Sequence, residues 1–149
     1  MTLAKSAFFA ALLVPAVAFA AGPGVYKARH DNFEAMGRAM KGTADQFKSG
    51  NPDIAAIRAN AAALAAAAPK VAGMFPKGSG IEGNPKSEAL PVIWQKPADF
   101  AAANKRLVDA TRAFQAAAAK GDMPAVQAAF GAVGGSCKGC HETFRKPRG

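Results

Sequence analysis

The chain has 149 residues but only two cysteines, two histidines and one tryptophan. Both cysteines stand in the segment CKGCH at residues 137–141, close to the C-terminus. No cysteine therefore remains for a disulfide elsewhere in the chain. A zinc site would need two more ligands of the usual kind, and His30 is the only other histidine. A thioredoxin-like dithiol would be expected beside a strand and a helix, and no strand pattern is apparent.

Acidic residues are also scarce, because 19 lysines and arginines face 10 aspartates and glutamates and give a net charge of +9. Such a charge can indicate nucleic-acid binding. Here, however, the basic residues are scattered, without a basic stretch interleaved with aromatic residues. We therefore expect no nucleic-acid partner and interpret the charge as a solvated basic surface. That surface can steer the protein toward an acidic redox partner or an anionic membrane surface.

A long apolar run occurs only at the N-terminus. Lys5 precedes an apolar stretch over residues 7–19, and Ala18-Phe19-Ala20 resembles a signal-peptide cleavage site. The run is short for a membrane span. We therefore expect a cleaved signal peptide over residues 1–20, a single domain over residues 21–149 and no transmembrane segment.

Two thiols separated by two residues and followed by a histidine are the signature of covalent c-type haem attachment. Each thiol forms a thioether with the haem, and the histidine supplies the proximal iron ligand. On a helix, Cys137 and His141 are four residues apart and share a face, and Cys140 lies on the adjoining part of the helix surface. The motif thus predicts one haem c bound by Cys137, Cys140 and His141, with dithiol chemistry as the alternative. Since bacterial c-type haem is assembled outside the cytoplasm, motif and signal peptide together predict the periplasm.

The remaining pattern is helical. The chain is rich in alanine, which favours helix, and apolar residues recur at spacings of three and four. We expect helices over residues 26–48, 53–68, 97–120 and 123–146. An irregular segment rich in glycine and proline separates the second from the third helix. Two short connections and one long crossover predict an all-α fold, an antiparallel four-helix bundle around one haem.

With these features in place, the chain resembles the class II c-type cytochromes of the cytochrome c′ family, which carry the haem motif near the C-terminus. The resemblance covers nearly all of the mature chain. It rests on four matches: Tyr26 and Arg29 in the first helix, Pro-Val-Ile-Trp at residues 91–94, the segment at residues 130–136 before the motif, and Phe144-Arg145 after it.

The resemblance implies a role for several residues. Arg29 is expected to pair with a haem propionate, and Arg145 to lie beside the haem and raise the local positive charge. Phe144 is expected in the core next to the haem. For Trp94, the single tryptophan, we weigh a contact with the haem edge against simple core packing. Family members often form homodimers through their first two helices, so the resemblance implies such a dimer as one alternative here and a monomer as the other.

Family members divide by the sixth iron position. The matching residue in this chain is Phe33, which has no lone pair for iron and predicts an open, apolar distal side with five-coordinate, high-spin iron. Such a site binds NO or CO. Met36 and Met40 share the helix face with Phe33, so a six-coordinate, low-spin electron carrier with one of these methionines as ligand is the alternative. His30 lies one position off this face and is expected at the surface.

These residues predict a binding or electron-transfer protein and not an enzyme. Peroxidase-like or NO-reducing chemistry would need acid–base groups on the distal side, and the first helix offers only His30, away from the expected axis. The expected partners are therefore diatomic gases and redox proteins.

Overall fold

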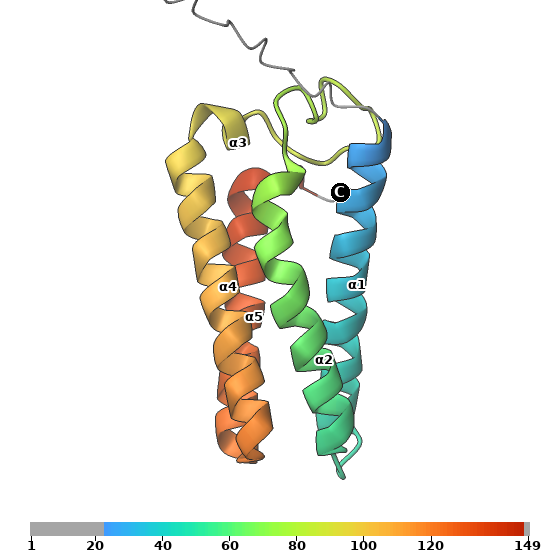
Figure 1. Cartoon of the computed structure of the whole chain (residues 1–149), viewed down its shortest axis with the longest axis vertical. Helices are drawn as coiled ribbons and strands as arrows, with labels where there is room; N and C mark the ends of the chain where they lie inside the picture. Colours follow the sequence, from blue (N-terminus) through green and yellow to red (C-terminus); the bar gives the residue numbers. More distant parts are fainter. Residues whose placement is uncertain (1–22, 148–149) are drawn as a thin grey trace, which may run out of the picture.

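The computed structural model describes residues 23–147 and contains no β-strand over that range. The predicted residues 1–20 of the signal peptide lie outside the described part. Four long helices form a bundle (Figure 1), which confirms the expected fold class. The elements are α1 (Pro23–Lys48), α2 (Ile54–Ala67), the 3-10 helix η1 (Ala68–Met74), α3 (Val92–Gln95), α4 (Pro97–Lys120) and α5 (Met123–Phe144).

Local sequence explains where the helices begin and end. Asp53 caps α2, since its carboxylate accepts a hydrogen bond from the Ala55 amide at 2.8 Å. Gly121 ends α4 in the left-handed conformation, at a φ of 81°, which glycine adopts without a steric penalty. The last helix was expected to reach residue 146 but ends at Phe144, because Arg145 is extended and forms a β-bridge with Ala89.

The bundle is packed unevenly along its length. Helix α4 packs on α5, α1 on α2, and α2 on α4, whereas α1 and α5 make no extended contact over the described residues. The half near the α1–α2 and α4–α5 turns has a closed core. Its fully buried side chains include Ile57, Leu64, Phe114, Val126 and Val133. In the other half, toward the long connection, residues of α1 and α5 line a cavity.

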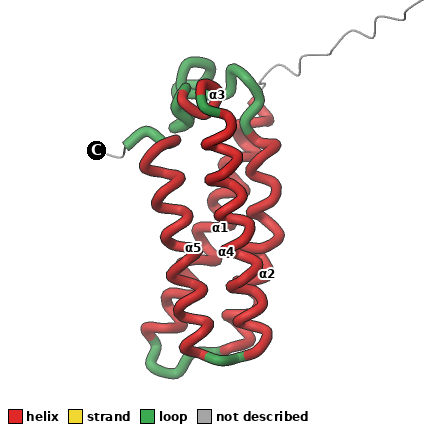
Figure 2. The backbone as a smooth tube through the Cα atoms, turned by 90° about the vertical axis from the view of Figure 1, so that its left-hand side faces the viewer, coloured by secondary structure: helices red, strands yellow, loops and turns green. Residues whose placement is uncertain are grey.

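The long connection between η1 and α3 covers one end of the bundle (Figure 2). A backbone pair ties it to the end of α5: the Leu90 amide donates to the Phe144 carbonyl at 3.0 Å, and the Lys146 amide donates to Glu88 at 2.7 Å. The loop is thereby fastened to the end of the last helix of the bundle. Within the described residues, no helix is long and apolar enough to cross a membrane.

The first prediction concerns the closed core. Phe114 is fully buried and its ring centroid lies 5.6 Å from that of Phe130. Because truncation leaves a cavity, Phe114→Ala should lower the free energy of unfolding by about 3–5 kcal/mol. Urea unfolding of the holoprotein, followed by far-UV circular dichroism, measures this loss. Gln115→Ala, at an exposed position of the same helix, is the control and should change stability by less than about 0.5 kcal/mol.

Candidate haem site

A cavity of about 840 Å³ lies where α1 and α5 stay apart. Its volume falls within the range of small-molecule and cofactor sites, roughly 300–1,000 Å³. Helices α1, α4 and α5 supply most of the wall, and η1, α3 and the connection between them supply the rest. The apolar part of the wall comprises Phe33, Met36, Met40, Val71, Phe75, Ile93, Phe100, Leu107 and Phe144.

The haem-attachment motif lies in the last two turns of α5, and Cys137, Cys140 and His141 all line the cavity. Both cysteines are partly buried and form no disulfide with each other. Burial raises the pKa of both thiols, and the neighbouring Cys137 raises the pKa of Cys140 further. Dithiols that exchange disulfides work through thiolates with lowered pKa values. The raised pKa values therefore argue against dithiol exchange, and it is the spacing of the motif that indicates haem attachment.

The polar atoms of the wall also fit a cofactor with polar substituents. Among the described residues, Asn104 Oδ1 and Arg145 Nε are buried side-chain atoms without a hydrogen-bond partner. Both residues line this cavity. Arg145 Nε nevertheless lies 3.9 Å from a Glu88 carboxylate oxygen, so it is ion-paired. The groups that fit a covalent haem are the two cysteines and the histidine on one helix of the wall, with Asn104, Lys86 and Arg145 as polar residues around the same cavity.

The side of the cavity opposite His141 is formed by α1. The centroid of the Phe33 ring lies 6.4 Å from the centroid of the His141 ring and 6.4 Å from the centroid of the Phe75 ring. Met36 is buried and also lines the cavity. Its sulfur, however, accepts a hydrogen bond from Asn32 Nδ2 at 3.9 Å. Met40 is partly buried on the same wall.

Arg29 lies at the end of the cavity and is 5% exposed. Its guanidinium donates to the Ser79 carbonyl at 2.7 Å and to the Ser79 and Ser87 hydroxyls, both at 3.0 Å. The guanidinium carbon also lies 4.6 Å from the centroid of the Phe75 ring, and burial lowers the pKa of Arg29. The structure thus shows Arg29 holding the loop. Its expected pairing with a haem propionate stays a prediction.

Arg145 and Trp94 differ in their relation to the cavity. Arg145 lines it and faces Glu88 of the loop, with 3.9 Å between Nε and the carboxylate. Trp94 is not among the described residues that line it. Its Nε1 donates to the Phe75 carbonyl at 3.0 Å, and thereby supports a residue that does line the cavity. For Trp94 the structure therefore shows a packing role, one of the two alternatives given above. A contact between Trp94 and the haem edge stays a prediction.

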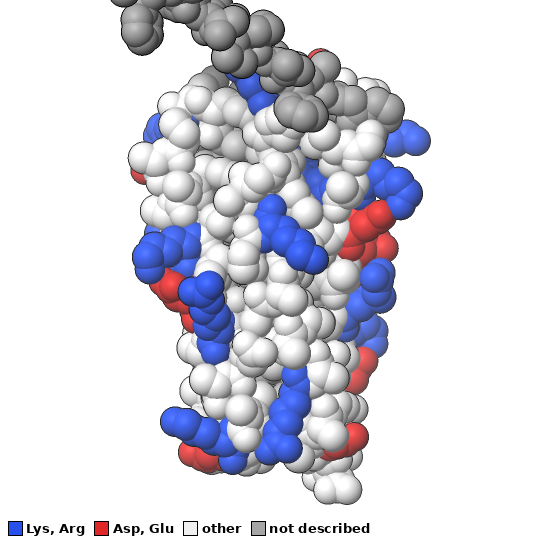
Figure 3. All heavy atoms as spheres, viewed as in Figure 1, with Lys and Arg blue, Asp and Glu red and all other residues white. Residues whose placement is uncertain are grey.

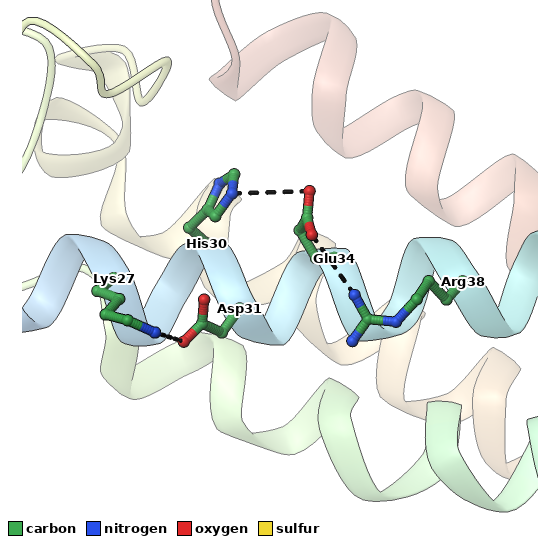
Figure 4. A network of polar contacts seen from close by, with 5 residues as sticks. All are labelled: Lys27, His30, Asp31, Glu34 and Arg38. Atoms are coloured by element: carbon green, nitrogen blue, oxygen red, sulfur yellow. Dashed lines mark hydrogen bonds and ion pairs between the residues drawn. The ribbon is translucent and has the colours of Figure 1, made fainter.

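His30 stands at the mouth of the cavity and is about half exposed, as expected for a surface residue. Figure 4 shows it in a row with Glu34 and Arg38 along α1, while Lys27 and Asp31 form a separate pair. Glu34 lies 3.6 Å from His30 and 3.4 Å from Arg38. Exposed pairs of this kind stabilise a helix by only about 0.3–0.5 kcal/mol.

Sequence reasoning named Phe75 only as an apolar anchor of the irregular segment, and it did not single out Asn104, Lys86 or Glu88; all four residues line the cavity. Lys86 and Glu88 lie in the irregular loop, where no periodic pattern indicates which way a side chain faces. Asn104 did carry a signal. It stands four residues after Phe100 and three before Leu107, so it is a polar residue on the apolar face of its helix.

Fold and site together define a helical-bundle c-type haem protein. The sequence model of cytochrome c′ matches residues 24–145. Cytochrome c′ of Pararhodospirillum photometricum is 37% identical over 118 residues, which cover 79% of this chain and 93% of that protein. The chain therefore belongs to the cytochrome c′ family, and its cofactor is one covalent haem c.

Solved structures agree with this assignment. A nitric oxide complex of a cytochrome c prime variant from Alcaligenes xylosoxidans has a TM-score of 0.74 and 31% identity, covering 83% of this chain and 94% of that one. Another cytochrome c′ structure is described as having ligand-controlled dimer dissociation. It has a TM-score of 0.75 and 30% identity over 83% of this chain and 95% of that one.

The contacts of Arg29 give the second prediction. Arg29→Met should destabilise the holoprotein by about 3 kcal/mol, because several hydrogen bonds from a buried charged group are lost. It should also speed amide hydrogen exchange in the loop, for example at Ile81, whose amide donates to Ala89. Thermal unfolding measures the loss of stability, and amide hydrogen exchange measures the opening of the loop. Lys27→Met, an exposed change on the same helix, removes the same charge and should leave the loop protected.

Proposed function

We propose that this protein is a periplasmic, monohaem c-type cytochrome with five-coordinate, high-spin iron that binds NO or CO. In this proposal Cys137 and Cys140 hold the haem through thioethers, and His141 is the single axial ligand from the protein. The observation that carries it is the position of Phe33, whose ring lies 6.4 Å from His141 across the cavity. Phenylalanine cannot coordinate iron, so the second axial position stays available.

The haem iron supplies a coordination position and a one-electron redox couple. The chain's own residues decide which ligand is admitted. Phe33 and Phe75 present apolar rings on the distal side. Their side chains have no hydrogen-bond donor to hold water or to stabilise a polarised ligand. Uncharged diatomics such as NO and CO are therefore favoured, with Phe33 as the steric gate. The nitric oxide complex among the similar structures supports this choice of ligand.

Electron transfer is the second part of the proposal, and no catalytic turnover is assigned. Figure 3 shows lysines and arginines distributed over the visible face, several beside acidic groups. The full sequence has a net charge of +9, and it becomes +8 once Lys5 is removed with the predicted signal peptide; this charge would attract acidic redox proteins by long-range steering. The scattered arrangement supports the expectation that nucleic acid is not a partner. The homodimer through α1 and α2 also remains a proposal, supported by the dimeric relative.

A six-coordinate electron carrier is the alternative function. Met36 and Met40 both line the cavity on the helix that carries Phe33, so either thioether would need only a local change to approach the iron. Against Met36 stands the contact between its sulfur and Asn32. In that case Met36→Ala or Met40→Ala would remove the ligand and convert the spectrum from low to high spin.

The third prediction concerns the optical spectrum of the purified holoprotein. The proposal predicts broad, high-spin spectra when oxidised and reduced, and a complete shift of the reduced spectrum with CO. Met36→Ala and Met40→Ala should keep these spectra, because neither side chain is a ligand. A sharp, low-spin reduced spectrum that CO does not change would refute the open site and establish the electron carrier instead.

The fourth prediction addresses the gate. Phe33→Ala should raise the association rate constant of CO by at least about tenfold, which corresponds to removing about 1.4 kcal/mol of steric barrier. Stopped-flow mixing of the reduced protein with CO measures the rate. Phe47→Ala, on the same helix but packed against Phe130 and outside the described cavity wall, is the control. Equal rates for wild type and Phe33→Ala would mean that Phe33 does not limit access.

A further inference from the structure

Two glycines stand in the interior of α1, and contacts within the protein account for only one of them. Glycine is, after proline, the least favourable residue for a helix interior, so each of the two needs a reason. A β-carbon on Gly42 would lie 3.0 Å from Asn60 Nδ2, a tighter contact than β-carbons usually make, so Gly42 lets α1 and α2 approach each other. A β-carbon on Gly37, by contrast, would meet no atom within 4 Å apart from its own helix backbone and its chain neighbours.

Gly37 lies on the face of α1 that lines the cavity, and every other residue that α1 contributes to the cavity wall has a long side chain. Gly37 follows Phe33 by one turn, so the two residues are neighbours on the helix surface. Because helical side chains lean toward the N-terminus, a side chain at position 37 would lie against the ring of Phe33. Its absence leaves a recess beside that ring.

The ring of Phe33 has to move before a ligand can bind opposite His141. Atoms that are not bonded to each other stay about 3.5–4.0 Å apart. The 6.4 Å between the ring centroids of Phe33 and His141 therefore leaves room for one flat group between the two rings and for no further ligand. Phe33 can admit a ligand only if neighbouring space receives its ring.

The other neighbours of Phe33 leave it little space. The Phe75 ring lies 6.4 Å away between centroids, in an edge-to-face arrangement. Arg29, one turn before Phe33, is buried and hydrogen-bonded to the loop. Met36, three residues after Phe33, is buried as well. The recess at Gly37 is thus the free space on the cavity face of α1 that adjoins the ring.

We propose that Gly37 is a positioning residue for Phe33: the space that it leaves free receives the Phe33 ring when a diatomic ligand such as CO binds. Gly37 touches no ligand in this arrangement and acts only through Phe33. The inference rests on the proposed binding of CO on the distal side, and it adds the space into which the steric gate opens. Filling the recess should hold the ring opposite His141 and thereby slow the binding of CO.

The test is a double-mutant cycle on the association of CO with the reduced holoprotein, measured by stopped-flow mixing. Gly37→Leu should lower the association rate constant by at least about tenfold, and Gly37→Ala should lower it by a smaller factor. In the Phe33→Ala background, Gly37→Leu should change the rate constant by less than about twofold, because no ring needs the recess. The control is Gly131→Ala, at an exposed glycine of α5 that also has open space at its β-carbon and does not line the cavity; it should leave the rate constant unchanged.

A structural measurement accompanies the rates. In the diamagnetic CO complex of the wild type, NMR should show nuclear Overhauser contacts between the ring protons of Phe33 and the α-protons of Gly37. The absence of these contacts would overturn the proposal, and so would equal slowing by Gly37→Leu with and without the Phe33 ring.

Two further outcomes separate the recess from its alternatives. If Gly37→Leu alters the optical spectrum of the CO-free protein, the recess belongs to the haem and the proposal is overturned. If Gly37→Leu does not fold, the same cycle with Gly37→Ala decides. A wild type that does not bind CO would refute the proposed function, and the role of Gly37 with it, whereas a wild type that binds CO at the same rate as Gly37→Leu would refute the role of Gly37 alone.

Discussion

The buried guanidinium of Arg29 is the contact on which the haem end of the bundle depends. It has carbonyl and hydroxyl oxygens of the loop around it and the Phe75 ring beside it. A buried cation is tolerated only when its donors are satisfied, so Arg29 and the loop require each other. The loop in turn forms the bridge between Ala89 and Arg145. One side chain of α1 thereby connects the first helix to the end of the helix that carries the haem motif.

This connection allows the bundle to contain a large cavity. At the other end, side chains such as Phe114 and Val133 fill the space between the helices, and the closed core holds the four helices together. Near the loop, α1 and α5 stay apart around a cavity of about 840 Å³. A cavity of this size lined by apolar side chains would be costly if it stayed empty. A covalently bound haem fills it and adds its own packing to the core.

The two sides of the cavity perform different tasks. Helix α5 carries the groups that attach and ligate the haem, whereas α1 carries Phe33 opposite His141. In the proposed function, the apolar rings of Phe33 and Phe75 on the distal side select ligands by size and polarity. The raised pKa values of Cys137 and Cys140 follow from the same apolar surroundings. Covalent attachment removes these thiols from further acid–base or redox chemistry.

The sequence by itself determined the helices, the haem motif and the residues that share a helix face. These features depend on local spacing: Cys137 and His141 are on one face of α5, and Phe33, Met36 and Met40 line one cavity, as their periodicity predicts. Only the tertiary structure decided the rest. Arg29 contacts Ser79 and Ser87 across 50 and 58 residues of chain, Trp94 supports Phe75 from outside the cavity wall, and Asn104 has an unpaired oxygen. The physical reason is that an irregular loop has no periodic sequence pattern from which the facing of its side chains can be predicted. In addition, the hydrogen-bond partner of a buried polar atom is often a residue distant in sequence.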